Sequence, residues 1–533
     1  MFESLCVGLY TAERMRAVDT AAIEGLGIPG GHLMERAGAA VAREIMLAFE
    51  PDSVLIYAGK GNNGGDGFVV ARELFNAGVE VLVCAVAGRK GYEGDALLNL
   101  RVAEKLGVEI VDGVVVADDV DVCVDAVFGT GFSGVAEGLA EAAIAAMNDS
   151  PAAVVALDIA SGVDASSGEV RGPAVLADLT VALHAPKVGH FVSPGFEYTG
   201  HVVEVPIGIP PSCDEEPDVF ALTGEAMGLL VRPKSTLDHK RSVGTVAVVG
   251  GCRGMTGAVH LAAMAGLRSG AGLVHCVLPD DLAHEKPFLE VINVAVPGAG
   301  RLGSESAAAI KEEMAAMKAT VLGPGMGRDD ETVALVRELV AEDVPLLIDA
   351  DGLWALGGEP ELLAARTAPT VLTPHEGELA RLLGVSAQEV GARRLALARD
   401  AAARSGATVL LKGARTIVAD PDGTAFIVPT GNPGLATPGS GDVLSGVIAG
   451  QLAKGLPATD AACLGAFVHG LAADLAVELA VSREGLIAGD LLDFLPLAVE
   501  SLIEDSDDDD GEDDEGHEGG CGCAAHRNDE EGD

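Results

Sequence analysis

Short apolar runs alternate along the chain with longer segments whose apolar residues recur at helical spacing. In the first half, the apolar runs predict strands at residues 53–58, 79–86, 120–127, 154–158 and 179–183. Helical spacing predicts two helices within residues 12–49, with a break at 27–30, and one helix from about Phe68 to Ala77. Strands that alternate with helices indicate a largely parallel sheet covered on both faces.

The second half shows the same alternation, although the two halves are not obvious repeats of each other. Its apolar runs predict strands at residues 244–250, 272–278, 320–323, 345–349, 370–373 and 408–412. Helices are expected from Asp442 to about Leu452 and over residues 460–479. The intervening residues 206–218 are rich in proline and acidic side chains, which indicates a domain boundary. We therefore expect two α/β domains, at residues 1–215 and 220–503.

Length, charge and cysteine content limit the possible functions. The chain has 533 residues, enough for two or three domains, and a net charge of −46. A protein with this negative charge repels nucleic acid and anionic lipid. An aromatic content of 3% also argues against a surface on which the bases of single-stranded nucleic acid stack. Nine dispersed cysteines fit reduced thiols, and no signal peptide is evident. We expect a cytoplasmic protein that binds neither nucleic acid nor membranes.

Residues 504–533 are rich in Asp, Glu and Gly. We expect an acidic disordered tail here, because this composition cannot bury a core. Cys521-Gly522-Cys523, flanked by His517 and His526, has the donors to capture a soft metal ion. An incidental solvated tail is the favoured interpretation in this low-complexity context.

The glycine-dense segment GKGNNGGDG, residues 59–67, follows a predicted strand and precedes a helix. Glycines let backbone N–H groups approach a phosphate, and a helix start favours an anion, although a structural glycine turn is the alternative. Asp125 and Asp158 end two further strands, at the edge where open α/β sheets bind ligands. Asn63, Asp125 and Ser161 supply the oxygen atoms that hard cations prefer. Each aspartate by itself can also be a helix cap or a turn former.

Several motifs resemble the NAD(P)HX epimerase family over about residues 10–210: GGHLMERAG (30–38), GKGNNGGDGFVVAR (59–72), VDAVFGTGFSG (124–134), LDIASGVDASSG (157–168) and KVGH (187–190). The resemblance implies a Rossmann-like three-layer α/β/α domain that interconverts the R and S forms of hydrated NADH and NADPH, with bound K⁺. The residues implied to contact the hydrate are Asn62, Asn63, Gly64, Gly65, Asp66, Gly129, Thr130, Gly131, Phe132, Ser133, Gly134, Val135 and Asp158.

The same resemblance implies that Asn63, Asp125 and Ser161 hold K⁺ and that Asp158 is the acid/base group. The chain departs from the family pattern at two positions. Ala160 replaces a usual proline, which predicts a looser turn around Ser161, and His32 replaces a usual apolar residue.

A second glycine turn, PGSGD at residues 438–442, opens another predicted helix. An anion over the amides of this turn would be stabilised as its charge develops, and Asp442 would take a proton from an attacking hydroxyl. An ordinary helix cap is the alternative role for Asp442. Lys412 follows a strand thirty positions upstream, and His375 lies beside two acidic residues at another strand end. This context favours contact with a ligand.

Further motifs resemble the ADP-dependent NAD(P)HX dehydratase family of the ribokinase-like superfamily over about residues 225–500: VVGG (248–251), GA (257–258), LGPGMG (322–327), DADGLWAL (349–356), LTPHEGEL (372–379), LKGART (411–416) and LATPGSGDVLSG (435–446). The resemblance implies a ribokinase-like α/β domain. Proteins of that family phosphorylate the ring hydroxyl of the S hydrate with ADP, or with ATP in other branches, and phosphate then leaves; the resemblance implies the same reaction here.

The residues implied to contact the hydrate in this domain are Ala258, Gly325, Gly327, His375 and Asp442. The residues implied to contact the nucleotide, whose phosphates carry Mg²⁺, are Lys412, Gly413, Ala414, Arg415, Thr416 and Gly441. Asp442 is the implied base. Met326 and Glu376 depart from the usual family residues, and Glu376 adds a charge near the pocket.

Together the resemblances predict a bifunctional isomerase and lyase. It would epimerise R- and S-NAD(P)HX and dehydrate the S form to NAD(P)H, with release of AMP and phosphate. We expect a homo-oligomer whose partners are NADHX, NADPHX and ADP. One alternative is a small-molecule kinase of the hydroxymethylpyrimidine or sugar type, against which the first half argues. The other is a non-catalytic nucleotide-binding regulator, against which Asp158 and Asp442 argue.

Overall fold

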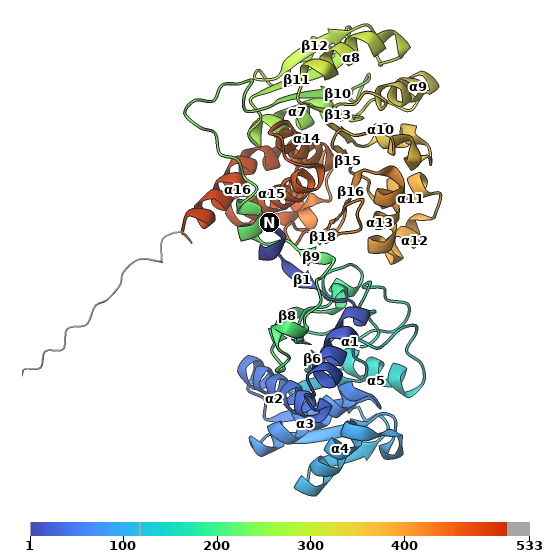
Figure 1. Cartoon of the computed structure of the whole chain (residues 1–533), viewed down its shortest axis with the longest axis vertical. Helices are drawn as coiled ribbons and strands as arrows, with labels where there is room; N and C mark the ends of the chain where they lie inside the picture. Colours follow the sequence, from blue (N-terminus) through green and yellow to red (C-terminus); the bar gives the residue numbers. More distant parts are fainter. Residues whose placement is uncertain (1, 117–118, 509–533) are drawn as a thin grey trace, which may run out of the picture.

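The computed structural model describes residues 2–116 and 119–508. These residues form two lobes, each built on its own β-sheet with helices on both faces (Figure 1). The first lobe contains most of the residues before the proline-rich boundary, and the second contains the residues after it. The N-terminus is an exception, because it lies against the second lobe.

The smaller sheet has the strand order β4-β3-β2-β5-β6-β7-β8, and all its neighbouring strands are parallel. Its strands are β2 (Ser53–Ala58), β3 (Glu80–Ala85), β4 (Glu109–Asp112), β5 (Val122–Ala126), β6 (Ala153–Leu157), β7 (Leu179–Leu183) and β8 (His201–Val205). The α-helices of this lobe are α1 (Ala12–Thr20), α2 (Gly30–Phe49), α3 (Asn62–Asn76), α4 (Gly94–Leu106) and α5 (Leu139–Asn148).

The smaller sheet buries both faces because alternate residues of a strand point to opposite sides. Val54 and Ile56 of β2 pack in one cluster with residues of α1 to α4. Leu55 and Tyr57 pack in another with residues of α5. The expected three-layer α/β/α arrangement is therefore confirmed. The strand order reverses between β2 and β5, which is the position where such sheets bind ligands.

The larger sheet has the order β1-β9-β18-β17-β16-β15-β14-β13-β10-β11-β12 and is parallel from β16 to β12. Its strands are β1 (Val7–Leu9), β9 (Val219–Ala221), β10 (Thr245–Val249), β11 (Leu273–Pro279), β12 (Ile292–Val296), β13 (Ala319–Leu322), β14 (Leu346–Ile348), β15 (Thr370–Leu372), β16 (Thr408–Leu411), β17 (Ile417–Ala419) and β18 (Ala425–Ile427). The α-helices of this lobe are α6 (Gly224–Gly228), α7 (Thr256–Arg268), α8 (Ala307–Ala316), α9 (Asp330–Leu339), α10 (Asp351–Leu356), α11 (Glu376–Leu383), α12 (Ala387–Ala392), α13 (Arg394–Ser405), α14 (Ser440–Ala453), α15 (Ala458–Leu479) and α16 (Ala488–Asp508).

Strand β10 shows the same division of the core in the second lobe. Val246 and Val248 pack with residues of α7, α14, α15 and α16. Ala247 and Val249 pack with residues of α8 to α11 and α13. Helix α15 is long and apolar enough to span a membrane, yet 67% of its most apolar 18-residue segment is buried inside the protein. It is a core helix of this lobe, in keeping with its place between α14 and α16 in Figure 1.

The first residues of the chain belong to the second lobe. Strand β1 pairs antiparallel with β9 at the edge of the larger sheet. The ring of Phe2, in the 3-10 helix η1 (Phe2–Leu5), lies 5.3 Å from the ring of Phe426. The chain therefore starts in the second lobe, builds the first, and returns.

Most predicted strands are confirmed to within a residue or two, but the helix predicted from Phe68 begins six residues earlier. Helix α3 starts at Asn62, with Gly61 as its N-cap residue, so most of the predicted turn is helical. The glycines are needed for close packing: a Cβ at Gly64 would lie 1.7 Å from the carbonyl oxygen of Gly59. The strands missing from the prediction are short or partly exposed: β1, β4, β8, β9, β12, β17 and β18.

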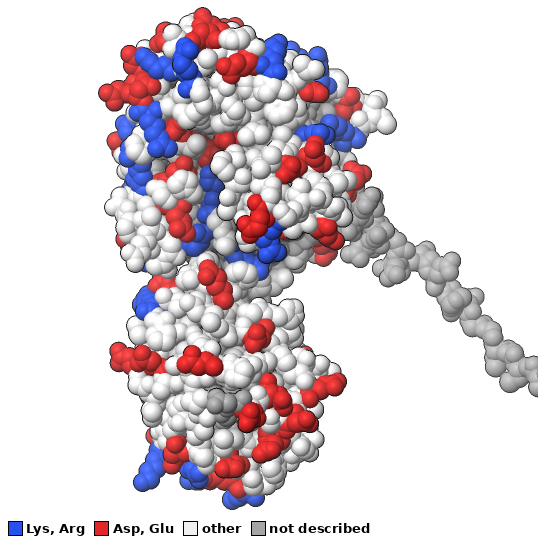
Figure 2. Space-filling model, turned by 180° about the vertical axis from the view of Figure 1, so that it is seen from behind, with Lys and Arg blue, Asp and Glu red and all other residues white. Residues whose placement is uncertain are grey.

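The tail was predicted to begin at residue 504, but helix α16 extends to Asp508, so the prediction of disorder is wrong for residues 504–508. Residues 509–533, with Cys521 and Cys523, lie outside the described residues. The seven cysteines within the described residues are free thiols. Acidic side chains are spread over both lobes and outnumber basic ones on the visible face of the first lobe (Figure 2). This distribution fits the strongly negative net charge of the chain.

Candidate active sites

A cavity of about 910 Å³ opens at the carboxyl ends of β2 and β5, where the strand order reverses. It brings together most of the residues expected to contact a hydrate in the first domain: Asn62, Asn63, Asp66, Gly129, Thr130, Gly131, Phe132, Ser133 and Asp158. The start of helix α3 therefore faces the cavity, as expected for an anion site. Gly64, Gly65, Gly134 and Val135 do not line it, and their contacts with a ligand stay predictions.

Asp158 follows β6 and is held by a buried lysine that the sequence analysis did not single out. The Lys187 ammonium forms an ion pair with Asp158 and donates a second hydrogen bond to the Leu183 carbonyl at 2.8 Å. The Lys187 side chain is only 1% exposed. Removal of one partner from such a buried pair leaves an uncompensated charge, which typically costs about 3–5 kcal/mol.

His190 fixes the backbone of Asp158. The Lys187 N–H donates to His190 Nδ1 at 3.1 Å, so the ring proton lies on Nε2, which donates to the Asp158 carbonyl at 3.0 Å. Burial, with the nearby Lys187 charge, lowers the pKa of His190 to about 3, so the ring stays neutral. This bond supports a left-handed backbone at Asp158, whose φ is 71°.

Two more carboxyl groups face Asp158 across the cavity. Burial, followed by the charges of Asp158 and Asp19, holds the pKa of Asp66 well above its usual range. Burial and Asp158 also raise the pKa of Asp19, which lines the same cavity. Asp66 is therefore a buried carboxyl group with a raised pKa in the same cavity as the ion-paired Asp158 carboxylate. Such environments assign one carboxyl group as a proton donor and its neighbour as a base.

Asp125, Ser161 and Asn63 meet at the Phe128 turn beneath this cavity. The Ser161 hydroxyl donates to Asp125 Oδ1 at 2.6 Å, and Asp125 Oδ2 accepts from the Ser161 N–H at 2.7 Å. Ser161 Oγ accepts from the Phe128 N–H at 2.8 Å, and the Asn63 amide donates to the Phe128 carbonyl at 2.9 Å. Burial raises the pKa of Asp125 to about 6. These neutral and anionic oxygens fit a hard monovalent cation. Ala160 replaces a usual proline in this turn, yet the neighbouring Ser161 is buried.

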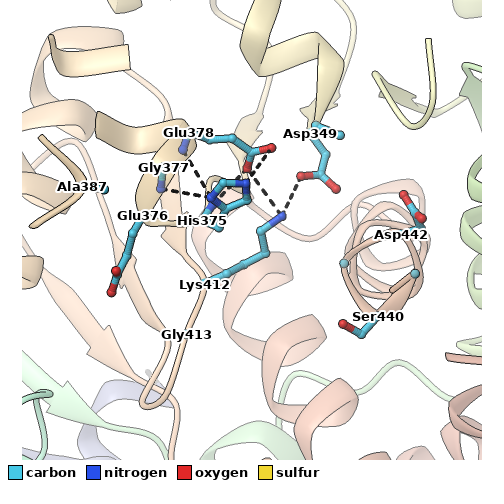
Figure 3. Close-up of a pocket in the computed structure, with 13 residues that line it drawn as sticks. Asp349, His375, Glu376, Gly377, Glu378, Ala387, Lys412, Gly413, Ser440 and Asp442 are labelled. Carbon is cyan, nitrogen blue, oxygen red and sulfur yellow. Dashed lines mark hydrogen bonds and ion pairs between the residues drawn. The ribbon is translucent and has the colours of Figure 1, made fainter. Parts of the chain in front are cut away.

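The second cavity, of about 730 Å³, lies at the carboxyl ends of β14 to β16 and at the start of α14 (Figure 3). Of the residues expected to contact hydrate or nucleotide, it brings together His375, Lys412, Gly413, Gly441 and Asp442. Ala414, Arg415 and Thr416 do not line this cavity. Neither do Ala258, Gly325 and Gly327, so these six residues stay predictions.

Asp442 is not the cap of its helix. Helix α14 begins at Ser440 and its N-cap is Gly439, with a φ of 90° and no side-chain cap. The Ser440 hydroxyl closes the turn by donating to the Leu435 carbonyl at 2.9 Å. Asp442 therefore stands in the first helical turn with its carboxylate in the cavity (Figure 3). The alternative role as a capping residue is excluded by this geometry.

Charge in the second cavity centres on Lys412, which faces three carboxylates. Its ammonium lies 2.9 Å from Asp349 and 3.8 Å from Glu378. Burial raises the pKa of Asp442 to about 7, the Asp349 charge adds to the rise, and Lys412 opposes it. Burial also raises the pKa of Glu378. A carboxyl group with a pKa near 7 is suited to take up a proton at neutral pH.

Asp349 and Glu378 are two further candidate functional residues, to which the sequence motifs assigned no role. Asp349 is buried at the end of β14, where the Ser445 hydroxyl of α14 also donates to it at 2.7 Å. Glu378 lies on α11 and accepts from the His375 N–H at 3.0 Å. Both occur within quoted motifs, but only the fold shows that they meet Lys412.

His375 and Glu376 have structural contacts besides their place in the cavity wall. His375 caps α11, since its Nδ1 accepts from the Gly377 N–H at 3.0 Å and the Glu378 N–H at 3.3 Å. Glu376 pairs with the buried Arg394 guanidinium at 2.5 Å. Arg394 also donates to the Lys412 carbonyl at 3.2 Å. The charge that Glu376 introduces is thus neutralised by an arginine that braces the Lys412 loop.

The glycine loop after β13 lies where the strand order of the larger sheet reverses, between β10 and β13. Gly325 has a φ of 61°, and a Cβ there would lie 2.5 Å from the Met255 carbonyl and 3.4 Å from Ala258 Cβ. The Gly327 N–H donates to Asp351 at 2.9 Å. Ala258, Gly325 and Gly327 thus gather beside Asp351, whose charge also raises the pKa of Asp442.

Comparison with known proteins gives matches along nearly the whole chain. The family model described as YjeF-related protein N-terminus matches residues 30–189, and the model described as NAD(P)H-hydrate dehydratase matches residues 246–496. The bifunctional NAD(P)H-hydrate repair enzyme Nnr of Moorella thermoacetica is 41% identical over 517 residues, which cover 93% of this chain and 97% of that protein. The protein of the same name from Thermofilum pendens is 38% identical over 508 residues, with 92% and 96% coverage.

A solved structure is also similar to part of this chain. The ADP/ATP-dependent NAD(P)H-hydrate dehydratase of Bacillus subtilis, co-crystallised with ATP and Mg²⁺, is 28% identical. It covers 53% of this chain and 98% of its own, with a TM-score of 0.47.

Proposed function

The chain belongs to the family of bifunctional NAD(P)H-hydrate repair enzymes. We propose that each of its two cavities catalyses one of the two reactions of that family. The protein epimerises R- and S-NAD(P)HX and dehydrates S-NAD(P)HX with ADP. We assign epimerisation to the cavity at β2 and β5 and dehydration to the cavity at α14. One observation carries this division: each cavity holds its own carboxylate and lysine at strand ends, on a separate sheet.

In the first cavity, Asp158 exchanges a proton with the hydrated ring, and Asp66, whose pKa is raised by burial, lines the same cavity. Lys187 holds the Asp158 carboxylate in place, and His190 holds its backbone. The amides at the start of α3 and the glycine loop over residues 129–133 bind the pyrophosphate portion of the substrate. This assignment is supported by the position of these residues around one cavity.

We propose that K⁺ is held by Asn63, Asp125 and Ser161. A cation there supplies positive charge beneath the glycine loop, next to a phosphate-bearing ligand. The buried Asp125, which already accepts hydrogen bonds from Ser161 and Val127, supplies the matching negative charge. The set contains only oxygen donors, which suits K⁺ and not a soft metal.

In the second cavity, Asp442 takes the proton from the ring hydroxyl of S-NAD(P)HX while this oxygen attacks the β-phosphorus of ADP. AMP leaves, and the phosphorylated hydrate then loses phosphate together with a proton from the neighbouring ring carbon, which forms the double bond of NAD(P)H. The amides at the start of α14 and the Lys412 ammonium face the developing negative charge. The pKa of about 7 at Asp442 leaves a substantial fraction of the base ionised at neutral pH.

We propose that ADP lies along Lys412 and Gly413, with Gly441 beneath its phosphates, and that the hydrate lies between His375 and Asp442. Ala258, Gly325 and Gly327 complete the hydrate site from the neighbouring loop. Mg²⁺ would be carried by the nucleotide phosphates, and the carboxylates around Lys412 would provide the oxygen ligands that this ion prefers. ATP would use the same contacts with one more phosphate.

We further propose the domain limits 1–215 and 220–503, with residues 2–9 structurally attached to the second domain. A cytoplasmic location is supported by the free thiols of the described residues. A homo-oligomer is proposed as the working assembly.

The test is to incubate the pure full-length chain with mixed R- and S-NAD(P)HX, Mg²⁺, K⁺ and either ADP or ATP. We expect complete conversion of both epimers to NAD(P)H, followed by absorbance, with AMP and phosphate as products from ADP. A stable phosphorylated product would instead indicate a small-molecule kinase. Nucleotide binding without turnover would indicate a regulator. Conversion that stops when S-NAD(P)HX is exhausted would remove the epimerase assignment.

A further inference from the structure

The turn that carries Lys187 and His190 of the first cavity is packed into the core of the second domain. This turn connects β7 to β8 through the 3-10 helices η4 (Val188–His190) and η5 (Gly195–Tyr198). Val188 and Val192 are fully buried, and they belong to the same hydrophobic cluster as Ile427 of the larger sheet. The second domain thus covers the back of the turn whose front faces Asp158.

The N-terminal segment adds a second attachment. Strand β1 pairs with β9 of the second domain, and Tyr10 follows it directly. The Tyr10 N–H donates to the Pro186 carbonyl at 2.9 Å, and the Tyr10 carbonyl accepts from the Val188 N–H at 3.1 Å. Lys187 is therefore flanked on both sides by hydrogen bonds to a segment anchored in the larger sheet.

The third attachment is an arginine of the second domain. The Arg415 guanidinium lies 4.0 Å from the ring centre of Phe196 and 5.9 Å from that of Phe191. Arg415 has a φ of 53°, which few residues other than glycine adopt. In this conformation its side chain lies over the first domain, while Lys412 and Gly413 of the same loop line the nucleotide cavity.

The hydrogen bonds of the turn connect these rings to the first active site. The Phe196 N–H donates to the Val192 carbonyl at 3.0 Å, and the Val192 N–H donates to the Val188 carbonyl at 3.1 Å. His190 lies inside this folded segment and bonds to Asp158 from it. A shift of Phe196 would therefore move the turn that holds Lys187 and His190 against the carboxylate.

We propose that Arg415 is a positioning residue for epimerisation: from the second domain it clamps Phe196 and Phe191, and so holds Lys187 and His190 against Asp158. This inference rests on the proposed location of epimerisation in the first cavity. It gives Arg415 a role in the reaction that uses no nucleotide, in addition to its predicted place near ADP.

The deciding measurement is R-to-S conversion by the full-length chain with no nucleotide present. Loss of a nucleotide contact cannot slow this reaction, whereas loss of a clamp can. We expect Arg415→Ala to lower kcat for epimerisation about tenfold, because small displacements of catalytic groups have effects of this size or larger. KM should change little, since Arg415 is not among the residues that line the first cavity. Arg415→Lys keeps a cation over the ring and should recover much of the lost rate.

The matched control is Arg381→Ala. Arg381 also stacks its guanidinium on an aromatic ring, 3.3 Å from the centre of Trp354, but this pair lies wholly within the second domain. Its loss should leave epimerisation unchanged. Phe196→Leu, which keeps an apolar side chain without an aromatic face, provides a second route to the same pair. The double variant Arg415→Ala with Phe196→Leu should be no slower than the slower single variant, because both remove one interaction.

The outcomes separate two failures. If the unaltered chain does not epimerise, the proposed function of the first cavity is wrong. If it does, and Arg415→Ala epimerises at the same rate, the clamp is wrong and the proposed function stands. A rate that falls equally in Arg415→Ala and Arg415→Lys, or in Arg381→Ala, also overturns the clamp, because the effect would not depend on a cation at Phe196.

Discussion

Replacing Asp442 with Asn should abolish dehydration and at the same time stabilise the second domain. The ionised Asp442 carboxylate is kept in a buried position beside the negative Asp349, which raises its pKa from 3.8 to about 7. This difference corresponds to about 4 kcal/mol at pH 8. Since the asparagine amide also loses water contacts, we expect a net gain of roughly 2–4 kcal/mol in the free energy of unfolding.

The size of this stabilisation depends on pH in a defined way. Above pH 7 the native state holds an ionised carboxylate that the unfolded chain solvates freely, so the full penalty is present. Below about pH 4 both states are protonated, and the penalty vanishes. The advantage of Asp442→Asn over the unaltered chain should therefore be largest at pH 8 and disappear as pH falls from 7 to 4.

The assay uses the single tryptophan of the chain. Trp354 lies on α10 in the second domain, so its fluorescence during urea unfolding reports on that domain. Dehydration of pure S-NAD(P)HX should fall at least about 100-fold, the usual effect of losing a general base. Epimerisation should be unchanged. Asp422→Asn is the matched control, because it removes the same charge from a position where hydrogen bonds, led by one from Thr424, lower the pKa. It should keep activity and slightly destabilise.

Either of two results would refute the reasoning. Normal dehydration by Asp442→Asn would show that another group takes the proton. A less stable Asp442→Asn protein at pH 8 would show that the carboxylate is favourably solvated or paired in the native state, which is inconsistent with a raised pKa.

Three further predictions concern pH and the first cavity. The kcat/KM of dehydration should fall about tenfold between pH 8 and pH 6, because the ionised fraction of a base with a pKa of about 7 falls from roughly 91% to 9%; a flat profile across this range would contradict Asp442 as the base. Asp158→Asn should stop R-to-S conversion while dehydration of pure S-NAD(P)HX continues, and an unchanged epimerisation rate measured by chromatography would reject the assignment. Lys187→Met should stop epimerisation and lower the free energy of unfolding by about 3–5 kcal/mol, since it leaves the Asp158 carboxylate buried without its partner; denaturation midpoints that match the unaltered chain would show that the pair contributes no net stability.

The elements that the sequence predicted well are those whose pattern has one physical meaning. Strand β2 is a continuous apolar run between polar residues, and a strand buried on both faces requires such a run. Strands β4 and β8 were missed because they lie at the sheet edges and carry exposed residues such as Glu109 and His201. The short strands β17 and β18 have only three residues each, too few to show a period.

The glycines of residues 59–67 were predicted to form a turn, yet most of them lie in a helix whose start still lines a cavity. Their density was interpreted as a turn, because glycine is usual where the backbone bends. In the structure Gly64 and Gly65 are helical, and they lack side chains because Gly59 and Met34 press against them. Only tertiary contacts reveal that reason. The helix start still faces the cavity, since both arrangements place the N–H groups of Asn62 and Asn63 at the end of β2.

Lys187 and Asp349 could not be assigned from spacing, because the partner of each is distant in the chain. Lys187 pairs with Asp158 only because β6 and β7 are neighbouring parallel strands. Asp349 meets Lys412 because β14 and β16 flank β15. The parallel topology thus creates both carboxylate–lysine pairs, but it uses them differently. Lys187 bonds to Asp158, the carboxylate assigned to proton transfer in the first cavity. Lys412 instead bonds to Asp349, so that among the described residues Asp442 has no ion-pair partner within hydrogen-bonding distance. An oxygen that must take a proton from a hydroxyl benefits from that lack of a partner, because a directly bound lysine would lower its basicity.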